Sequence, residues 1–160
     1  MVDSLTPRFP RHCETKVSGS EIKCPPKQSK KGVNMKLLHT MIRVKDIEKS
    51  LKFYQELLGL KLAKKKRLDD CMLYFLSDEY GEVQIELTHN DETPESGYDI
   101  GTGFGHFAFG VDSLDEFTKK MKDFGCEYLW EPFKLSAVGS TIAFIKDPDG
   151  YEIELIELVS

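Results

Sequence analysis

Two histidines and two glutamates recur at matched positions in the sequence and could bind a metal ion. Glu86 follows His39 at an offset of 47, and Glu154 follows His106 at an offset of 48. The offset is 67 between the two histidines and 68 between the two glutamates. Self-similarity at a fixed offset is typical of repeated modules. We therefore expect a duplicated unit that contributes one His and one Glu per copy, and the two pairs could make one four-ligand metal site.

Two imidazoles and two carboxylates form a ligand set of intermediate hardness, which suits nickel, cobalt, zinc or manganese rather than copper(I). Four protein ligands on an octahedral ion leave two positions for substrate oxygens or water. Such an ion is a Lewis acid that stabilises an enediolate, and a ligand carboxylate that leaves the metal can move a proton. The set predicts isomerisation beside a carbonyl group.

The elements that must position these residues follow the order strand, helix and three strands, twice over. Apolar alternation and turn residues predict the first module's strands at 37–44, 60–68, 71–78 and 82–89, with a helix from Asp46 to Gly59. The second module has expected strands at 104–111, 126–130, 140–147 and 151–158, with a helix at 112–125. We expect an α+β fold of two tandem βαβββ modules, at about 35–98 and 99–160.

A capping residue and the spacing of apolar residues support the helix predicted from Asp46 to Gly59. Asp46 is placed to cap it, and Ile47, Leu51, Tyr54 and Leu58 recur at helical spacing. That stripe predicts a helix that covers one face of a sheet.

Strand periodicity places further polar residues beside the ligand candidates. His39, Met41 and Arg43 share one face of their strand, because side chains alternate along a strand. Glu86 and Asn90 share a face of theirs for the same reason. Arg43 and Asn90 should therefore point in the same direction as the ligands.

The segment at 1–34 differs in composition from the rest of the chain. It is rich in Pro, Ser and Lys and lacks a hydrophobic period, so we expect a disordered N-terminal extension before a domain at 35–160. This segment has a net charge of +4. Because the whole chain has a net charge of −5, the remainder has a net charge of −9. An acidic body disfavours nucleic acid and anionic membranes as partners.

We expect a soluble, cytoplasmic protein. No apolar run approaches the roughly 20 residues of a membrane span, and no signal-peptide pattern opens the sequence. The cysteines Cys13, Cys24, Cys71 and Cys126 form no C-x-x-C pair, which favours reduced thiols.

Several polar residues have simpler structural interpretations. The basic stretch Lys64–Arg67 is interpreted as a solvated sheet edge. Asp147, Asp149 and Gly150 are expected to do no more than shape a turn. His89 falls on the opposite strand face from Glu86, so we assign it no role in the site.

From residue 35 to about 158 the sequence resembles the bacterial glyoxalase I (lactoylglutathione lyase) family of the vicinal oxygen chelate superfamily. The matching stretches are LLHTMIRV, SLKFYQELLGLKL, VQIELTHN, GTGFGHFAF and TIAFIKDPDGYEIELIE. The resemblance implies a homodimer of paired βαβββ modules whose curled mixed sheets form a metal-binding trough between the subunits. The implied substrate is the hemithioacetal of methylglyoxal and glutathione, which is isomerised to S-D-lactoylglutathione through an enediolate in methylglyoxal detoxification.

The resemblance also implies roles for individual residues. The metal positions fall on His39, Glu86, His106 and Glu154; Glu154 is the favoured base, and Glu86 is its partner. Arg43 and Asn90 match positions that contact glutathione. Lys134, in a loop at 131–141 that is longer than in bacterial relatives, is a candidate contact for the glutathione carboxylate. The compact body favours nickel or cobalt over zinc, although the ligand set suits all three.

Three alternatives share the fold. An epimerase of methylmalonyl-coenzyme A would also move a proton beside a thioester, and fold alone does not separate the two. Arg43 and the stretch IELTHN favour glutathione. A ligand-sequestering protein of the bleomycin-resistance type would not need the four ligands, and a fosfomycin-inactivating thiol transferase normally uses three.

Overall fold

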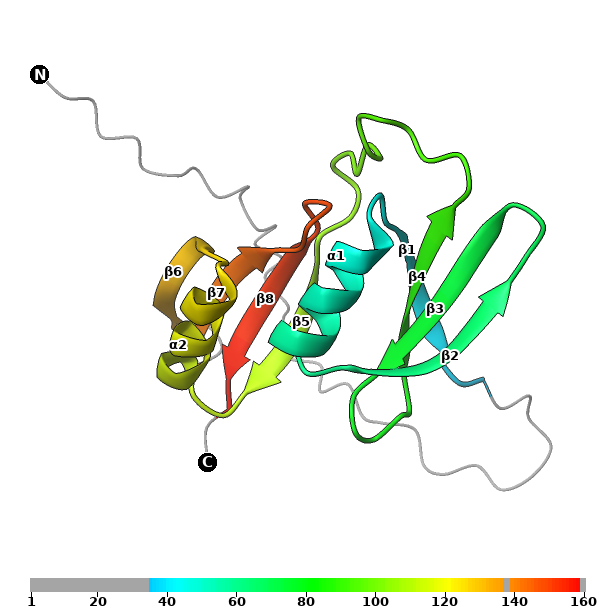
Figure 1. Ribbon diagram of the computed structural model, residues 1–160. Coiled ribbons are helices and arrows are strands. Elements are labelled where there is room, and N and C mark those ends of the chain that lie inside the picture. Colours follow the sequence, from blue (N-terminus) through cyan, green and yellow to red (C-terminus); the bar gives the residue numbers. More distant parts are fainter. Residues whose placement is uncertain (1–34, 137–138, 159–160) are drawn as a thin grey trace, which may run out of the picture. The chain divides into compact units, whose positions relative to one another are not determined.

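The computed structural model describes residues 35–136 and 139–158 (Figure 1). The predicted extension at residues 1–34 lies outside the described residues, as do residues 137–138 and 159–160. Among the described helices, none is both long and apolar enough to cross a membrane.

The predicted βαβββ order is confirmed in both halves of the described chain. The first module contains β1 (His39–Arg43), α1 (Ile47–Lys52), a π-helical segment η1 (Phe53–Leu57), β2 (Lys61–Arg67), β3 (Cys71–Ser77) and β4 (Gln84–Asn90). The second contains β5 (His106–Val111), α2 (Leu114–Phe124), β6 (Tyr128–Leu135), β7 (Ser140–Lys146) and β8 (Glu152–Glu157). The two modules form sheets of order β1-β4-β3-β2 and β5-β8-β7-β6.

Each sheet is mixed in the same way. The first strand runs parallel to the last, β1 to β4 and β5 to β8, and the other pairs are antiparallel. Parallel neighbours need a long crossover connection, which here includes the helix and the two antiparallel strands. The first and last strands of each module are therefore adjacent in space, although they are the most distant strands of the module in sequence.

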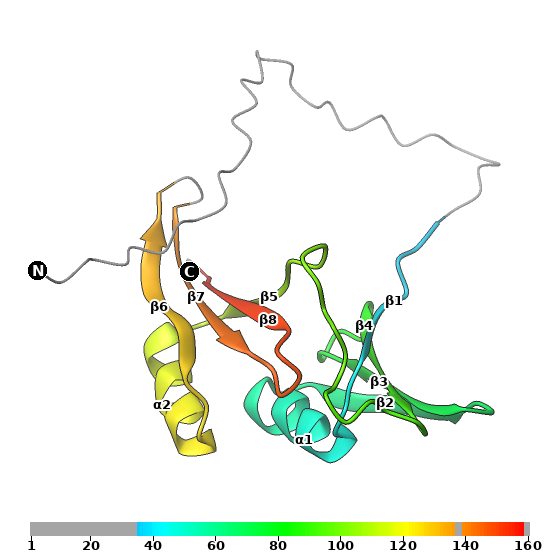
Figure 2. The same ribbon diagram turned by 90° about the horizontal axis from the view of Figure 1, so that it is seen from above.

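Helix α1 begins as predicted. The side chain of Asp46 accepts a hydrogen bond from the Lys49 backbone N–H at 3.2 Å. The helix continues into η1, where the wider π turn buries Phe53 and Leu57 beside the predicted Tyr54. In both views the helices of the two modules lie near each other (Figures 1 and 2), and the rings of Phe53 and Phe124 pack edge-on with centroids 6.4 Å apart.

Strand β6 is longer than the sequence predicted. The short strand expected at 126–130 extends to Leu135, so Lys134 lies in a strand opposite Thr141 and not in a loop. Glu131 and Pro132 are poor strand formers, but β6 is an edge strand whose pairing has register shifts on either side of Trp130. An edge strand tolerates proline because its outward N–H groups have no ladder partner.

One hydrophobic core joins the two modules. Its fully buried members include Tyr54, Leu76 and Leu87 of the first module and Ile145, Ile153 and Leu155 of the second. Leu87 and Leu155 alternate with Glu86 and Glu154, so β4 and β8 turn apolar side chains to the core and carboxylates to the opposite face.

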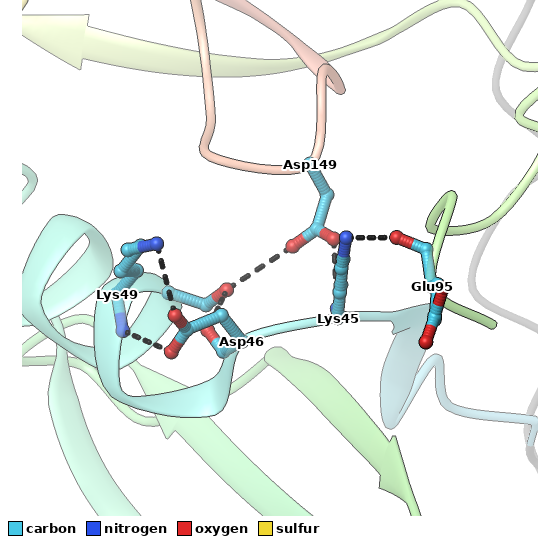
Figure 3. A network of polar contacts seen from close by, with 6 residues as sticks. Lys45, Asp46, Lys49, Glu95 and Asp149 are labelled. Atoms are coloured by element: carbon cyan, nitrogen blue, oxygen red, sulfur yellow. Dashed lines mark hydrogen bonds and ion pairs between the residues drawn. The ribbon is translucent and has the colours of Figure 1, made fainter. Parts of the chain in front are cut away.

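The turn before β8 also connects the modules, which corrects its interpretation as a turn alone. Asp149 accepts hydrogen bonds from the Lys45 backbone N–H at 2.7 Å and from the Ser50 hydroxyl at 3.2 Å (Figure 3). The amino group of Lys45 donates to the Glu95 carbonyl. The turn is thereby attached to the segment that joins β1 to α1.

Asp147 makes the most buried of these connections. One carboxylate oxygen accepts from the Tyr54 hydroxyl at 2.9 Å, and the other accepts from the backbone N–H groups of Asp149 and Tyr151 at 2.9 and 2.8 Å. Burial raises the pKa of Asp147 to about 6, although these hydrogen bonds act in the opposite direction. The loss of solvation therefore outweighs the hydrogen bonds.

The raised pKa of Asp147 predicts a pH-dependent contribution to stability. A carboxyl group whose pKa is about 6 in the folded state and about 3.8 in the unfolded state favours folding when protonated, so its contribution is present below pH 4 and is lost as the pH rises through 6. The difference corresponds to about 3 kcal/mol. The amide of Asp147→Asn cannot ionise, so the free energy of unfolding of the variant should rise relative to wild type by this amount between about pH 4 and pH 7.

Urea denaturation across that pH range measures the difference. Asp112→Asn, on the exposed turn before α2, controls for the loss of one carboxylate. A constant difference between Asp147→Asn and wild type would contradict the assignment of the titration to Asp147.

Candidate functional site

The structure brings the four predicted ligands together as two pairs. In the first sheet, Nε2 of His39 lies 3.0 Å from Oε2 of Glu86. In the second sheet, Nε2 of His106 lies 3.0 Å from Oε2 of Glu154. The duplication inferred from sequence spacing is thus matched by equal geometry.

Parallel strand pairing produces each contact. His39 is in register with Gln84, and Met41 with Glu86, so the imidazole and the carboxylate project from the same face of adjacent strands. The same applies to His106 on β5 and Glu154 on β8. The glutamate side chains are 10% and 14% exposed, whereas the histidines are 40% and 43% exposed. Each pair therefore has a nearly buried carboxylate and an imidazole open to solvent.

A phenylalanine supports each imidazole, which the sequence analysis missed. Phe75 on β3 is in register with Glu86, and its ring meets His39 edge-on at 5.6 Å between centroids. Phe144 on β7 is in register with Glu154, and its ring meets His106 edge-on at 5.5 Å. The offset between these phenylalanines is close to the offset between the ligand pairs. Comparing the third strand of each module, CMLYFLS with STIAFIK, would have revealed them.

The two carboxylates differ in their hydrogen bonds. The Thr88 hydroxyl donates to Oε1 of Glu86 at 3.1 Å in a buried position. The corresponding position in the second module, two positions after Glu154, is Ile156. In the described part of the chain, the Glu154 carboxylate contacts His106, and no hydroxyl in the position of Thr88 donates to it. The hydrogen bond from Thr88 to Glu86 therefore has no hydroxyl counterpart at Glu154 among the described residues.

Each pair has the composition and spacing of two ligands on one metal ion. Metal–nitrogen and metal–oxygen bonds of about 2.1 Å at a right angle place the donor atoms roughly 3.0 Å apart, which matches both pairs. Within residues 35–136 and 139–158, no three His, Cys, Asp or Glu side chains come together as a metal-binding group. The described part of a single chain thus holds two separate pairs of candidate ligands.

The structure places Arg43 and Asn90 on the same sheet face as Glu86. Arg43 is in register with Thr88, and Asn90 ends β4. Arg43 lines a cavity of about 270 Å³ together with its neighbours on β1, Tyr151, and Tyr98 and other residues of the connection between the modules. Both residues therefore lie on the strand face that alternation predicted.

Lys134 lies in the other sheet. It is exposed and is in register with Thr141, next to the pair formed by Phe133 and Ile142. Because Ile142 is in register with Ile156, two positions after Glu154, Phe133 lies on the Glu154 face of the sheet. Alternation then places Lys134 on the opposite face. The structure does not bring Lys134 together with Arg43 and Asn90.

An ion pair holds the end of β4 next to Asn90. The guanidinium group of Arg67 donates two hydrogen bonds to the Asp91 carboxylate and lowers the pKa of Asp91. The Asp91 backbone N–H donates to the Asp70 carbonyl at 2.9 Å. These contacts fix the backbone that follows Asn90.

Comparisons with known proteins agree with this arrangement. The family model of the Glyoxalase/Bleomycin resistance protein/Dioxygenase superfamily matches residues 36–155. A probable lactoylglutathione lyase of Synechocystis is 44% identical over 130 residues, which cover 79% of this chain and 98% of that protein. A lactoylglutathione lyase of Neisseria meningitidis is 42% identical over 127 residues, which cover 77% of this chain and 91% of that protein.

Solved structures show the same fold. Glyoxalase I of Zea mays superposes with a TM-score of 0.68 at 35% identity over 78% of this chain and 45% of that chain. This chain thus spans less than half of the maize chain. The trypanothione-dependent glyoxalase I of Leishmania major gives a TM-score of 0.65 at 35% identity, covering 78% of this chain and 87% of that chain. The chain therefore belongs to the glyoxalase/bleomycin resistance protein/dioxygenase superfamily.

Proposed function

We propose that the chain is a glyoxalase I, which isomerises the hemithioacetal of methylglyoxal and glutathione to S-D-lactoylglutathione. The observation that carries the proposal is the matched pair of His–Glu contacts at 3.0 Å, one in each sheet. They occur in a chain whose relatives at 42% and 44% identity are named lactoylglutathione lyase. These relatives favour the lyase over the epimerase and the ligand-sequestering protein.

The active enzyme is a homodimer. Since one chain holds two separate half-sets of ligands among its described residues, a four-ligand site needs the first-sheet pair of one copy to face the second-sheet pair of another. A twofold axis makes two such sites at once, because the same surfaces are exchanged in both directions. His39, Glu86, His106 and Glu154 then supply two nitrogens and two oxygens per site.

Two imidazoles and two carboxylates are ligands of intermediate hardness, which suit nickel, cobalt and zinc. The compact body makes nickel or cobalt the proposed metal, with zinc as the alternative. When bound, such an ion acts as a Lewis acid that stabilises negative charge on the two adjacent oxygens of the substrate. The remaining steps belong to the side chains.

Glu154 is the base. It removes the proton from the carbon that bears the sulfur and the hydroxyl group, which leaves an enediolate. The proton is then delivered to the neighbouring carbonyl carbon, and the hydroxyl proton moves to the oxygen of that carbon, so the product is an isomer of the substrate. The Glu154 carboxylate suits this role because among the described residues no hydroxyl holds it, whereas Thr88 donates to Glu86.

Glu86 is the partner carboxylate on the other side of the substrate, and the hydrogen bond from the Thr88 hydroxyl holds it in place. Arg43 and Asn90 contact glutathione on the Glu86 face, where Arg43 can pair with a carboxylate in bidentate fashion. Contact of Lys134 with glutathione stays a prediction. The strand register places its side chain on the sheet face opposite to that of Glu154.

The direct test of the proposed function is the rise in thioester absorbance when methylglyoxal and glutathione are added to metal-stripped protein. The protein is re-supplied separately with nickel, cobalt and zinc. We expect turnover with nickel or cobalt and little with zinc. The highest rate with zinc would overturn the choice of metal, and no turnover with any metal would overturn the function.

Two substitutions on β8 test Glu154 as the base. Glu154→Gln removes the base and keeps the shape of the side chain, so turnover should fall by at least about 100-fold while the fold is retained. Glu152→Gln, on the same strand face, is the matched control. Near-normal turnover by Glu154→Gln would contradict the role.

Ile156→Thr should place a hydroxyl beside Glu154, as Thr88 does beside Glu86. A hydrogen bond to the carboxylate makes it a weaker base, so we expect kcat to fall by about tenfold. Ile156→Val gives a side chain with the shape of threonine but without the hydroxyl, so comparing the two variants isolates the effect of the hydrogen bond. Equal kcat values for the two variants would show that the freedom of the Glu154 carboxylate does not matter.

A further inference from the structure

Strand β2 forms one edge of the first sheet (Figure 1). It carries a run of exposed basic residues. Lysines on an edge strand often serve only to prevent pairing with another chain. The pairing of β2 with β3 places the basic residues of this run on two different faces of the sheet. Lys64 is opposite Phe75 and Lys66 is opposite Leu73, whereas Lys65 is opposite Tyr74 between them. Lys64 and Lys66 therefore share one face, and Lys65 lies on the other.

The face that Lys64 and Lys66 share is the face of the candidate site. Phe75 is in register with Glu86, and Leu73 with Thr88. Along the four strands of this face the only acidic residue is Glu86. The site face of the first sheet thus has cationic groups at both edges, with Arg43 on β1 and Lys61, Lys64 and Lys66 on β2.

The side chain of Lys64 lies over the sheet and does not extend away from its edge. Its Nζ atom is 5.6 Å from the centroid of the Phe75 ring, which in turn contacts His39 at 5.6 Å between centroids. Lys65 makes the equivalent contact with Tyr74 at 5.1 Å, on the opposite face. A cation above an aromatic ring is attracted by the ring's quadrupole. Lys64 is therefore held on the same phenylalanine that supports a candidate metal ligand.

Lys66 and Arg43 occupy the same cross-strand row. Arg43 is in register with Thr88, Thr88 with Leu73, and Leu73 with Lys66. Three strand spacings separate the two cations, which is about 14 Å between their Cα atoms. An extended tripeptide is about 10 Å long, and both long side chains can reach inward. The row is the right length for a ligand that has a carboxylate at each end.

We propose that Lys64 and Lys66 bind an anionic group of the substrate at the edge of the site opposite Arg43 and Asn90. The inference rests on the proposed function and names its substrate class, a hemithioacetal that carries a carboxylate toward β2. That carboxylate can belong to the thiol, as the second carboxylate of glutathione, or to the 2-oxoaldehyde. The lysines supply affinity and do not take part in proton transfer.

The test compares the double variant K64Q/K66Q with K65Q, which removes one charge from the other face of the same strand. Both are assayed as metal-loaded enzyme with methylglyoxal and glutathione. Calorimetry with S-hexylglutathione, an unreactive thioether, measures binding without turnover. If the carboxylate belongs to the thiol, we expect K64Q/K66Q to raise KM and the Kd of S-hexylglutathione by about tenfold, with kcat unchanged. K65Q should match wild type.

Two further substrates identify the source of the carboxylate. If it belongs to glutathione, esterification of the glycine carboxylate should raise the KM of wild type by about the same factor and leave K64Q/K66Q unaffected. If it belongs to the oxoaldehyde, the variant should match wild type with methylglyoxal and lose affinity only for the hemithioacetal of 4-carboxyphenylglyoxal. Either pattern supports the proposal.

The proposal is overturned if K64Q/K66Q equals K65Q with every substrate and in S-hexylglutathione binding. Failure of the proposed function has a different signature. Wild type would then turn over no substrate with any metal, while weaker S-hexylglutathione binding by K64Q/K66Q would still support the lysine site.

Discussion

Parallel pairing between the first and last strands of each module is the constraint on which the candidate site depends. It brings His39 beside Glu86 and His106 beside Glu154, although the members of each pair lie at opposite ends of their module in sequence. In an antiparallel meander of the same strands, the first and last strands would lie at opposite edges of the sheet and could not bring these residues together. The crossover that parallel pairing requires also carries the helix that contributes Phe53, Tyr54 and Leu57 to the core. The geometry of the two His–Glu pairs and the core thus have the same topological origin.

The two modules repeat this geometry, but their surroundings have diverged. The first module holds its carboxylate with Thr88 and has cations at both edges of its site face. The second, in its described part, leaves Glu154 without a hydroxyl donor and places Trp130 against Phe144, with ring centroids 4.8 Å apart. These differences suit a division of roles in which the first sheet binds the charged parts of a substrate and the second provides the base.

The sequence predicted most of the fold and which histidine pairs with which glutamate. The His and Glu residues could be found because their spacing repeats and because alternation along a strand fixes which side chains share a face. The Asp46 cap was predictable because its contacts are local. Phe75 and Phe144 were missed because an apolar residue on an apolar strand gives no local signal of its contact with a histidine.

The errors arose where tertiary contacts override local preference. Strand β6 continues through Glu131 and Pro132 because an edge strand tolerates them. Asp147 and Asp149 have the composition of a turn, but their bonds to Tyr54, Lys45 and Ser50 connect segments that are far apart in sequence. The basic stretch on β2 does lie exposed at a sheet edge, as predicted, but a register shift between Leu62 and Lys64 sets which of its lysines share the face of Glu86.

Complementation between two inactive variants tests most directly whether a second copy completes each site. One variant carries His39→Ala and Glu86→Ala, and the other carries His106→Ala and Glu154→Ala. If each site combines the first sheet of one copy with the second sheet of another, a mixed dimer has one intact site. The co-expressed variants should then recover about a quarter of the wild-type rate, since half of the dimers are mixed. No recovery in dimers shown by mass to be mixed would mean that each site lies within one chain, and would contradict the account.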